Sequence, residues 1–209
     1  DHRDLHSFPT RRSSDLNLLL INPGPTLQNA NYSKIIIDHQ YGGELAYAPL
    51  RHLPAHELAV IAQDNPQFYG RTDGFLCALA KDREESAKGS VVQITLENGS
   101  YEAAYATTLQ NLDLLKRIKG IFVETDKSAF GVMNALQDSG LIIPDDVALV
   151  GYDDVEWCAY SHPALTTIHQ PRTDVARLAA KIISGQILKR DTTVQTHILK
   201  PTLVLRKST

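Results

Sequence analysis

The chain has 209 residues, of which 43% are hydrophobic and 22% charged, and its formal net charge is −3. This length allows one large domain or two small ones with a buried core. The 21 basic residues do not outnumber the 24 acidic ones, so the composition excludes a chain built as a whole to neutralise nucleic-acid phosphates. Without a long apolar run or a secretion signal, we expect a cytoplasmic protein with no membrane partner.

The first sixteen residues, DHRDLHSFPTRRSSDL, contrast with the apolar run that follows them. All sixteen codons can be back-translated into a widely used short-read sequencing adapter. We therefore interpret residues 1–16 as a disordered artefact of sequence assembly, rather than a natural arm with a basic patch, and exclude them from the fold. On this interpretation the natural protein extends upstream of Asn17.

From Asn17 onward, short apolar runs alternate with amphipathic stretches, which is typical of strand–helix units in a parallel sheet. The pattern predicts strands at 18–21, 35–37, 58–62, 91–96, 120–123 and 147–152. It predicts helices at 43–53, 70–83, 100–116, 127–139 and 173–189, the first weakened by a proline. A connecting stretch runs to residue 168, and two β-rich runs, 196–199 and 203–206, complete the predicted elements.

Motifs for catalysis and for cofactors are scarce in this sequence. It has no glycine-rich phosphate loop, no Gly-x-Ser-x-Gly elbow and no His-Glu-x-x-His helix, so we expect neither an enzyme nor a cofactor. His52 and His56 are four residues apart, but Pro54 disrupts the helical face that a shared metal ion would need. The two cysteines, Cys77 and Cys158, form no metal spacing or disulfide framework, which fits a reducing compartment.

Polar residues follow several of the predicted strands, at the edge where open parallel sheets bind their ligands. They are Asn22, Asp38, Asn65, Thr125, Asp126 and Asp153. Arg71 begins the helix after strand 58–62, and its planar guanidinium could hold a hydroxyl pair or a carboxylate. The pattern predicts a cleft for a polar small molecule, with Leu96 as an apolar wall and no metal ion.

Four segments together resemble the LacI/GalR family of bacterial transcription regulators, and the resemblance covers residues 17–209. They are RTDGF at 71–75, IPDDVALVGYDD at 143–154, PALTTIHQP at 163–171 and LVLRKS at 203–208. The resemblance implies a periplasmic-binding-protein-like α/β core: two lobes, each a parallel sheet with helices on both faces, with the effector held between them. In the family a helix-turn-helix domain precedes this core.

Residue by residue, the resemblance implies that Arg71 and Asp153 bind the effector. Thr125 stands where many relatives have Asn, and Asn22 where many have Asp, so the sequence departs from the family at both positions. Leu96 occupies a place that is aromatic in a purine-responsive relative, which counts against a stacked purine. Helix 127–139 and the segment around Tyr160 fall where relatives dimerise.

The resemblance also implies a nearly complete C-terminal lobe, at 39–170 and 194–209, and only a remnant of the N-terminal lobe, at 17–38 and 171–193. The leading hypothesis is the effector-sensing, dimerising part of a regulator that binds a sugar or a nucleoside-like molecule. Operator DNA would be bound by a helix-turn-helix domain upstream. The alternative is the solute-binding protein of a sugar ABC transporter, and an α/β enzyme is the third class considered.

Overall fold

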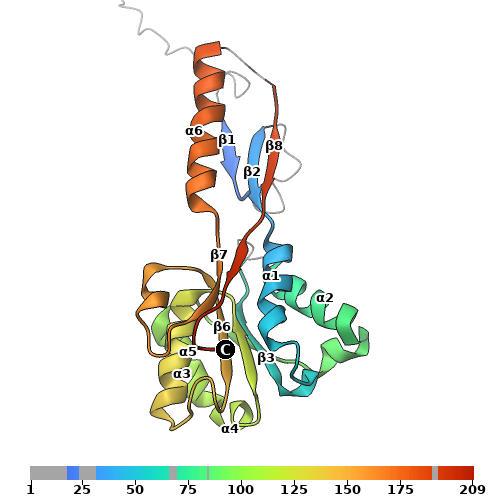
Figure 1. Cartoon of the computed structure of the whole chain (residues 1–209), viewed down its shortest axis with the longest axis vertical. Coiled ribbons are helices and arrows are strands. Elements are labelled where there is room, and N and C mark those ends of the chain that lie inside the picture. The colour runs from blue at the N-terminus through green and yellow to red at the C-terminus, as the bar shows by residue number, and fades with distance from the viewer. Residues whose placement is uncertain (1–17, 24–31, 66–69, 84, 190–192) are drawn as a thin grey trace, which may run out of the picture. The chain divides into compact units, whose positions relative to one another are not determined.

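The computed structural model is described over residues 18–23, 32–65, 70–83, 85–189 and 193–209 (Figure 1). The opening residues, expected to be disordered, lie outside this part. The chain divides into a larger unit, Ile37–Arg172 with Ile198–Thr209, and a smaller one formed from Asp1–Ile36 and Thr173–His197. In the described residues, no helix is both long enough and apolar enough to cross a bilayer.

The larger unit is built on a six-stranded sheet in the order β4-β3-β5-β6-β7-β9. Its strands are β3 (Leu58–Gln63), β4 (Val92–Leu96), β5 (Gly120–Val123), β6 (Ala148–Asp153), β7 (Thr166–His169) and β9 (Thr202–Val204). The first five strands are parallel, and only β9 runs antiparallel, against β7. The carboxyl ends of the parallel strands therefore meet at one edge of the sheet.

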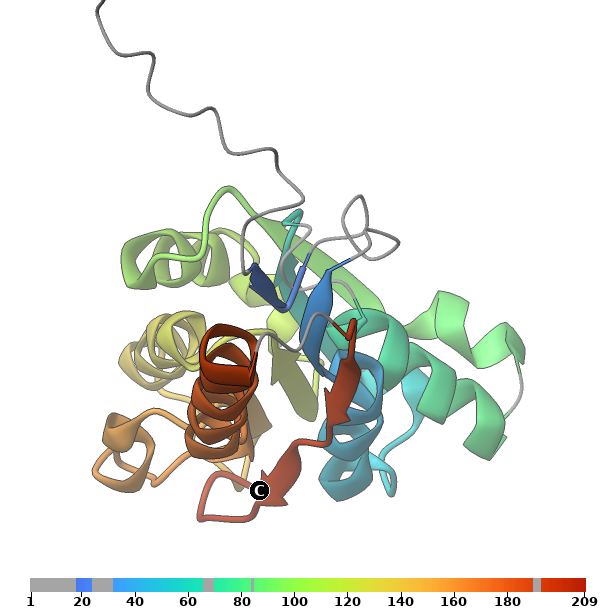
Figure 2. The same cartoon turned by 90° about the horizontal axis from the view of Figure 1, so that it is seen from above.

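Helices cover both faces of this sheet (Figure 2). One face carries α1 (His39–Tyr47) and α2 (Arg71–Arg83), and the other α3 (Tyr101–Gln110) and α5 (Asp126–Asp138). A short helix α4 (Leu112–Leu115) follows α3. The expected α/β class, a parallel sheet with helices on both faces, is confirmed.

The central strands alternate between two apolar cores, which explains why they read as continuous apolar runs. In β3, Leu58 and Val60 pack under α1 and α2, whereas Ala59 and Ile61 pack under α3 and α5. Burying one such aliphatic side chain stabilises the fold by about 1.5–3 kcal/mol. The packing of these two cores holds the strands in place, and with them the polar residues at the carboxyl ends of the strands.

Three elements of the larger unit differ from the expectation, and one of them is the helix expected at 100–116, which is divided at Asn111 into α3 and α4. The helix expected at 43–53 is α1, which begins at His39 because the Asp38 carboxylate caps it by accepting a 2.9 Å hydrogen bond from the Tyr41 N–H. It ends at Tyr47, and a 3-10 turn at Ala48–Leu50 contains the proline. Residues 166–169, expected to be part of a connection, form the buried strand β7.

The smaller unit contains a three-stranded sheet, β1-β2-β8, and one long helix. Its elements are β1 (Leu19–Ile21), β2 (Ser33–Ile37), β8 (Thr196–Leu199) and α6 (Arg172–Lys189). The helix buries Val175 and Ile182 and leaves Leu188 exposed. The resemblance assigned residues 194–209 to the C-terminal lobe, but β8 pairs in this smaller sheet and the boundary falls after His197.

The contact between α3 and α5 at Gly131 generates a prediction about stability. A Cβ added at Gly131 would lie 2.3 Å from the Tyr101 carbonyl oxygen and 3.0 Å from the Ala104 Cβ. We expect Gly131→Ala to lower the free energy of unfolding by about 1–3 kcal/mol because the helices must separate. Urea denaturation measures the loss. The control is Gly185→Ala in α6, where a Cβ meets nothing within 4 Å; an equal loss there would contradict this explanation.

Candidate functional site

Arg71 begins α2 directly above the carboxyl edge of the larger sheet, and it is only 2% exposed. Its Nη2 lies 3.3 Å from Oδ1 of Asp153. Its guanidinium carbon lies 3.9 Å from the centroid of the Tyr152 ring, and Nη1 donates to the backbone oxygen of Glu124. A desolvated guanidinium over an aromatic face is stabilised by about 2 kcal/mol. The group is therefore fixed in place by β5 and β6.

Asp153 is the last residue of β6, and its backbone has φ of 123°, in a region that side-chain-bearing residues rarely adopt. Its Oδ1 accepts a hydrogen bond from the Gln170 side-chain amide, and its backbone oxygen accepts one from Arg172. Burial raises the pKa of the Asp153 carboxyl, and the Arg71 charge opposes that rise. The Arg71–Asp153 ion pair therefore places the N–H donors of a guanidinium beside the acceptor oxygens of a carboxylate.

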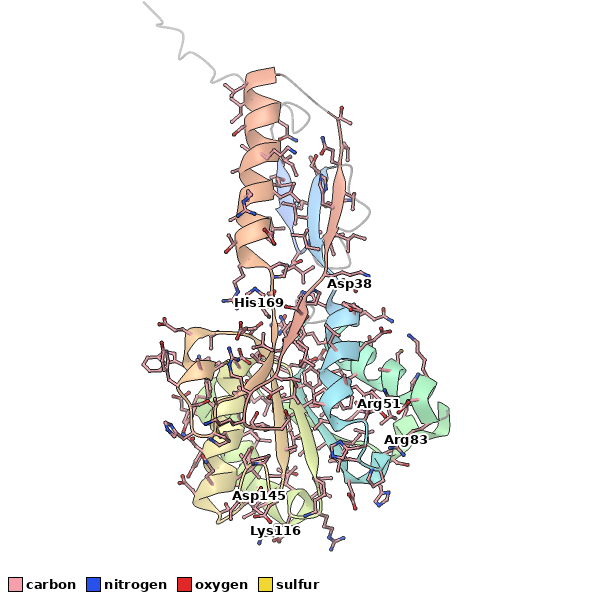
Figure 3. The ribbon with its side chains drawn as sticks, viewed as in Figure 1. Asp38, Arg51, Arg83, Lys116, Asp145 and His169 are labelled. Atoms are coloured by element: carbon pink, nitrogen blue, oxygen red, sulfur yellow. The ribbon has the colours of Figure 1, made fainter. Side chains whose placement is uncertain are left out.

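Asp154 anchors the segment that follows β6. Its carboxylate accepts a hydrogen bond of 2.7 Å from Nη2 of Arg206 and pairs with Nδ1 of His169 at 2.8 Å. Although burial opposes it, these partners hold the pKa of the Asp154 carboxyl below its usual value. Figure 3 labels His169 at the carboxyl end of β7, with Lys116 and Asp145 at the opposite edge of the larger unit.

A pocket of about 430 Å³ opens at the carboxyl ends of β3 and β4. Its lining residues are Ala62, Gln63, Asp64, Asn65, Gly70, Thr72, Asp73, Thr95 and Glu124. Gly70 and Thr72 flank Arg71 in the chain, and Arg71 donates to the backbone oxygen of Glu124, so the pocket lies next to Arg71, although neither Arg71 nor Asp153 is one of its lining residues. A volume of this size accommodates a small ligand.

Glu124 forms the buried wall of the pocket, with 5% of its surface exposed. Its Oε1 accepts a 2.8 Å hydrogen bond from the Thr72 hydroxyl, and its Oε2 accepts one of 3.2 Å from the Gln63 backbone N–H. Burial raises the pKa of Glu124, whereas these donors and the Arg71 charge favour the ionised form. The site thus combines one guanidinium with the partly buried carboxylate of Asp153 and the buried carboxylate of Glu124.

Of the site residues expected from the sequence, Arg71 and Asp153 lie together and Asn65 lines the adjoining pocket. Thr125 has a structural task, because its Oγ1 caps α5 by accepting from the Ser128 N–H at 3.3 Å. Leu96 is 3% exposed in the core under α3 and α5, since the alternation of β4 directs it away from the pocket face.

Two further strand-end residues lie elsewhere. Asn22 belongs to the smaller unit, where it follows β1 with φ of 45° and donates its backbone N–H to the Ile35 oxygen. Asp126 is fully buried and accepts hydrogen bonds from the Thr167 hydroxyl, at 2.6 Å, and the Val155 N–H, at 3.0 Å. Asp126 therefore ties α5 to β7 and to the segment after β6.

Sequence reasoning missed Glu124, Tyr152 and Gln170. Glu124 is the first polar residue after the apolar run of β5, so the strand-end rule that selected Thr125 could have found it. Gln170 follows β7, which was not expected to be a strand. Tyr152 reads as an ordinary buried strand residue, and only the structure shows its ring under Arg71.

Among the residues that the structure describes, no group of three or more His, Cys, Asp or Glu side chains could hold a metal ion. The described side chains offer fixed hydrogen-bond donors and acceptors beside a pocket. Such a set suits the recognition of a polar molecule.

Comparison with known proteins identifies the family to which this fold belongs. The profile of the family described as periplasmic binding protein-like domain matches residues 50–209. A LacI-family transcriptional regulator from Burkhoderia phymatum is 31% identical, with a TM-score of 0.75 over 91% of this chain and 68% of its own. A LacI-family regulator from Enterococcus faecium, solved with bound ribose, is 27% identical, with a TM-score of 0.77 over 87% of this chain and 67% of its own.

Among curated proteins, the HTH-type transcriptional repressor PurR of Vibrio atlanticus (strain LGP32) is 27% identical over 199 residues. The match covers 94% of this chain and 58% of the repressor, so the chain spans little more than half the length of such relatives. Fold and comparisons together define a periplasmic-binding-protein-like effector domain. Within that class, the chain belongs to the LacI/GalR family of transcription regulators, which confirms the resemblance of its four segments.

His39 generates a prediction about pH. Its Nδ1 lies 3.1 Å from the Tyr152 hydroxyl, and burial together with the Arg71 charge lowers the pKa of His39 from 6.5 to about 4. The unfolded chain therefore binds a proton below pH 6.5 that the folded chain does not, so stability falls as the pH drops towards 4. We expect this group to remove about 1 kcal/mol of the free energy of unfolding between pH 6.5 and about pH 5.

Denaturation as a function of pH checks this expectation, with the variant His39→Gln compared against the parent chain. The variant should lose less stability on acidification. His56→Gln, at an exposed histidine, serves as the control and should follow the parent. Identical pH profiles for His39→Gln and the parent would show that His39 is not the group responsible.

Proposed function

We propose that this chain is the effector-sensing part of a LacI/GalR-type transcription regulator and that it binds a small polar ligand, with a sugar as the leading class and a nucleoside-like molecule as the second. The observation that supports this most strongly is the buried Arg71, paired with Asp153 at 3.3 Å beside a pocket at the carboxyl edge of the sheet. The guanidinium donates to ligand oxygens and the carboxylate accepts from ligand hydroxyls.

A hydroxyl-rich ligand suits this pair because each sugar hydroxyl both donates and accepts a hydrogen bond. The ribose bound to the Enterococcus faecium regulator supports the sugar class for this chain. Asn65, which lines the pocket, is proposed as a further contact. Asn22, Thr125 and Leu96 stay predictions from the sequence, and of these Thr125 and Leu96 have side chains already engaged in capping and in the core.

Binding alone explains such a function, and no bond of the ligand is made or broken, so the chain is not proposed to be an enzyme. An effector that binds one conformation of the regulator more tightly shifts the population towards that conformation. Operator DNA would be bound through a helix-turn-helix domain of the regulator, in the cytoplasm. Neither a cofactor nor a membrane takes part in this proposal.

The second candidate is a solute-binding protein of a sugar ABC transporter, which the family description also accommodates. The relatives named as repressors and LacI-family regulators favour the first candidate. Genomic DNA upstream of the codon for Asn17 would distinguish them. A helix-turn-helix sequence there supports the regulator, and a secretion signal supports the transporter component.

We also propose that the regulator is a homodimer that uses α5 and the segment after β6. Trp157 and Tyr160 are 71% and 62% exposed, although aromatic side chains of this size are usually covered. With Phe130 and Met133 of α5 they line a pocket of about 320 Å³. An apolar, aromatic surface of this composition is typical of protein–protein interfaces.

The effector site is tested by calorimetric titration of the chain with D-ribose and other sugars. We expect Arg71→Lys and Asp153→Asn each to weaken binding by about tenfold or more, because a hydrogen bond to a charged group is lost. Circular dichroism verifies that the variants fold. Arg51→Lys is the matched control, since Arg51 forms an exposed ion pair with Asp82. Full affinity in both site variants would overturn the proposed site.

The dimer is tested by analytical ultracentrifugation of the parent chain and of the double variant Trp157→Ser, Tyr160→Ser. We expect a concentration-dependent dimer in the parent and at least about a tenfold weaker association in the variant, because truncated aromatic anchors cost more than 1 kcal/mol each. Replacing the exposed Leu114 by Ser is the control. A parent chain that stays monomeric at every concentration would contradict the proposal.

A further inference from the structure

The pocket beside Arg71 has an uneven distribution of charge. Its charged lining residues are Asp64, Asp73 and Glu124, and no basic side chain lines it among the described residues. Asp64 and Asp73 are exposed at the rim, whereas Glu124 is 5% exposed. A ligand that enters this pocket therefore meets negative charge on several sides.

Glu124 also fixes the direction in which hydrogen bonds run. An ionised carboxylate only accepts, so a ligand atom that meets Glu124 must donate. The donors from Thr72 and Gln63 hold this carboxylate in one orientation in the wall, at 2.8 and 3.2 Å. Because both donors come from residues that line the pocket, the carboxylate is part of a built site rather than a mobile surface group.

The neighbouring guanidinium does not reverse this balance. Arg71 forms its ion pair with Asp153, at 3.3 Å, and donates Nη1 to the backbone oxygen of Glu124. Arg172 is a second cation near Asp153, where it donates to the backbone oxygen, but neither arginine lines the pocket, whereas three carboxylates do. A phosphate or carboxylate in the pocket would add negative charge to a region that already has an excess.

We propose that Glu124 is a specificity-determining residue of the effector site, which selects an uncharged or amino-substituted sugar or nucleoside and rejects its phosphorylated form. This inference rests on the proposed function, because it assigns a ligand class to the same site. Hydroxyl or ammonium donors of the ligand point to Glu124, while Arg71 and Asp153 hold the adjacent hydroxyls.

The test is calorimetric titration of the chain with two matched sets: D-glucose, D-glucosamine and D-glucose 6-phosphate, then D-ribose and D-ribose 5-phosphate. In at least one set, the uncharged or amino sugar should bind at least about tenfold more tightly than the phosphate ester, because like charges repel more strongly in a partly desolvated site. Arg71→Lys, measured in parallel, identifies which binding occurs at the effector site.

Glu124→Gln keeps the shape of the side chain and removes its charge. It should therefore reduce the gap in affinity between the sugar and its phosphate ester, expressed as the ratio of their Kd values, by at least about fivefold. Glu102→Gln, at an exposed carboxylate of α3 outside the pocket, is the matched control and should leave the gap unchanged. Asp73→Asn, at the exposed rim, is a second variant that should narrow the gap even where Glu124→Gln is unstable.

Three results would overturn the inference, and they differ in what survives. If the phosphate ester binds as tightly as the sugar or more tightly, and Arg71→Lys weakens that binding, the effector site stands and only the proposed selectivity is wrong. If the ratio of the affinities for the sugar and for its phosphate ester is unchanged in both Glu124→Gln and Asp73→Asn, these carboxylates do not determine the selectivity. If Arg71→Lys weakens the binding of none of the compounds, the proposed function is rejected and the proposed selectivity with it.

Discussion

The burial of one guanidinium at a sheet edge is the constraint on which the site depends. Arg71 is 2% exposed, and an arginine remains charged at any pH that a folded protein experiences. Its burial is tolerable only because neighbours replace the lost water: the Tyr152 ring at 3.9 Å, the Asp153 carboxylate at 3.3 Å and the Glu124 backbone oxygen. These partners are the last two residues of β6 and the residue that follows β5. The parallel sheet therefore acts as the scaffold that keeps a charged group desolvated and oriented before any ligand arrives.

The packing of α1 on the sheet also helps to hold the Tyr152 ring in place next to Arg71. A Cβ at Gly42 of α1 would lie 2.2 Å from the Tyr152 hydroxyl, so the absence of a side chain there lets the helix approach the ring that carries Arg71. The same tyrosine hydroxyl meets the His39 imidazole, which burial keeps neutral by lowering its pKa. A second positive charge is thereby kept away from Arg71. Tyr152 therefore belongs both to the polar network around Arg71 and to the apolar core between α1 and β6.

The sequence predicted the parts of this structure that depend on local pattern. Apolar runs located β3 to β6, the Ser100 cap located α3, the strand-end rule located Asp153, and the predicted start of the helix after β3 located Arg71. It failed where tertiary contacts decide. The segment that forms β7 contains two threonines, whose hydroxyls bind Asp126 and the Arg206 backbone, and a run of polar residues gives no sign of burial. The direction of Leu96 depends on which face of β4 it occupies, and single-sequence alternation does not distinguish the two faces.

The turn at the end of β6 has a strained backbone, and it positions the Asp153 carboxylate that is proposed to bind the ligand. Asp153 and Asp154 are consecutive residues with positive φ, 123° and 52°, and each such conformation costs of order 1–3 kcal/mol unless its surroundings enforce it. The pairing of Asp154 with Arg206 and His169 provides that enforcement from the far side of the turn. The turn directs consecutive carboxylates to different partners, Asp153 towards Arg71 and Asp154 towards β7 and the segment after β9. Because the strained turn is held by groups that do not contact Arg71, the distance between the guanidinium and the Asp153 carboxylate is set by the fold itself, and a ligand would find both groups already in position.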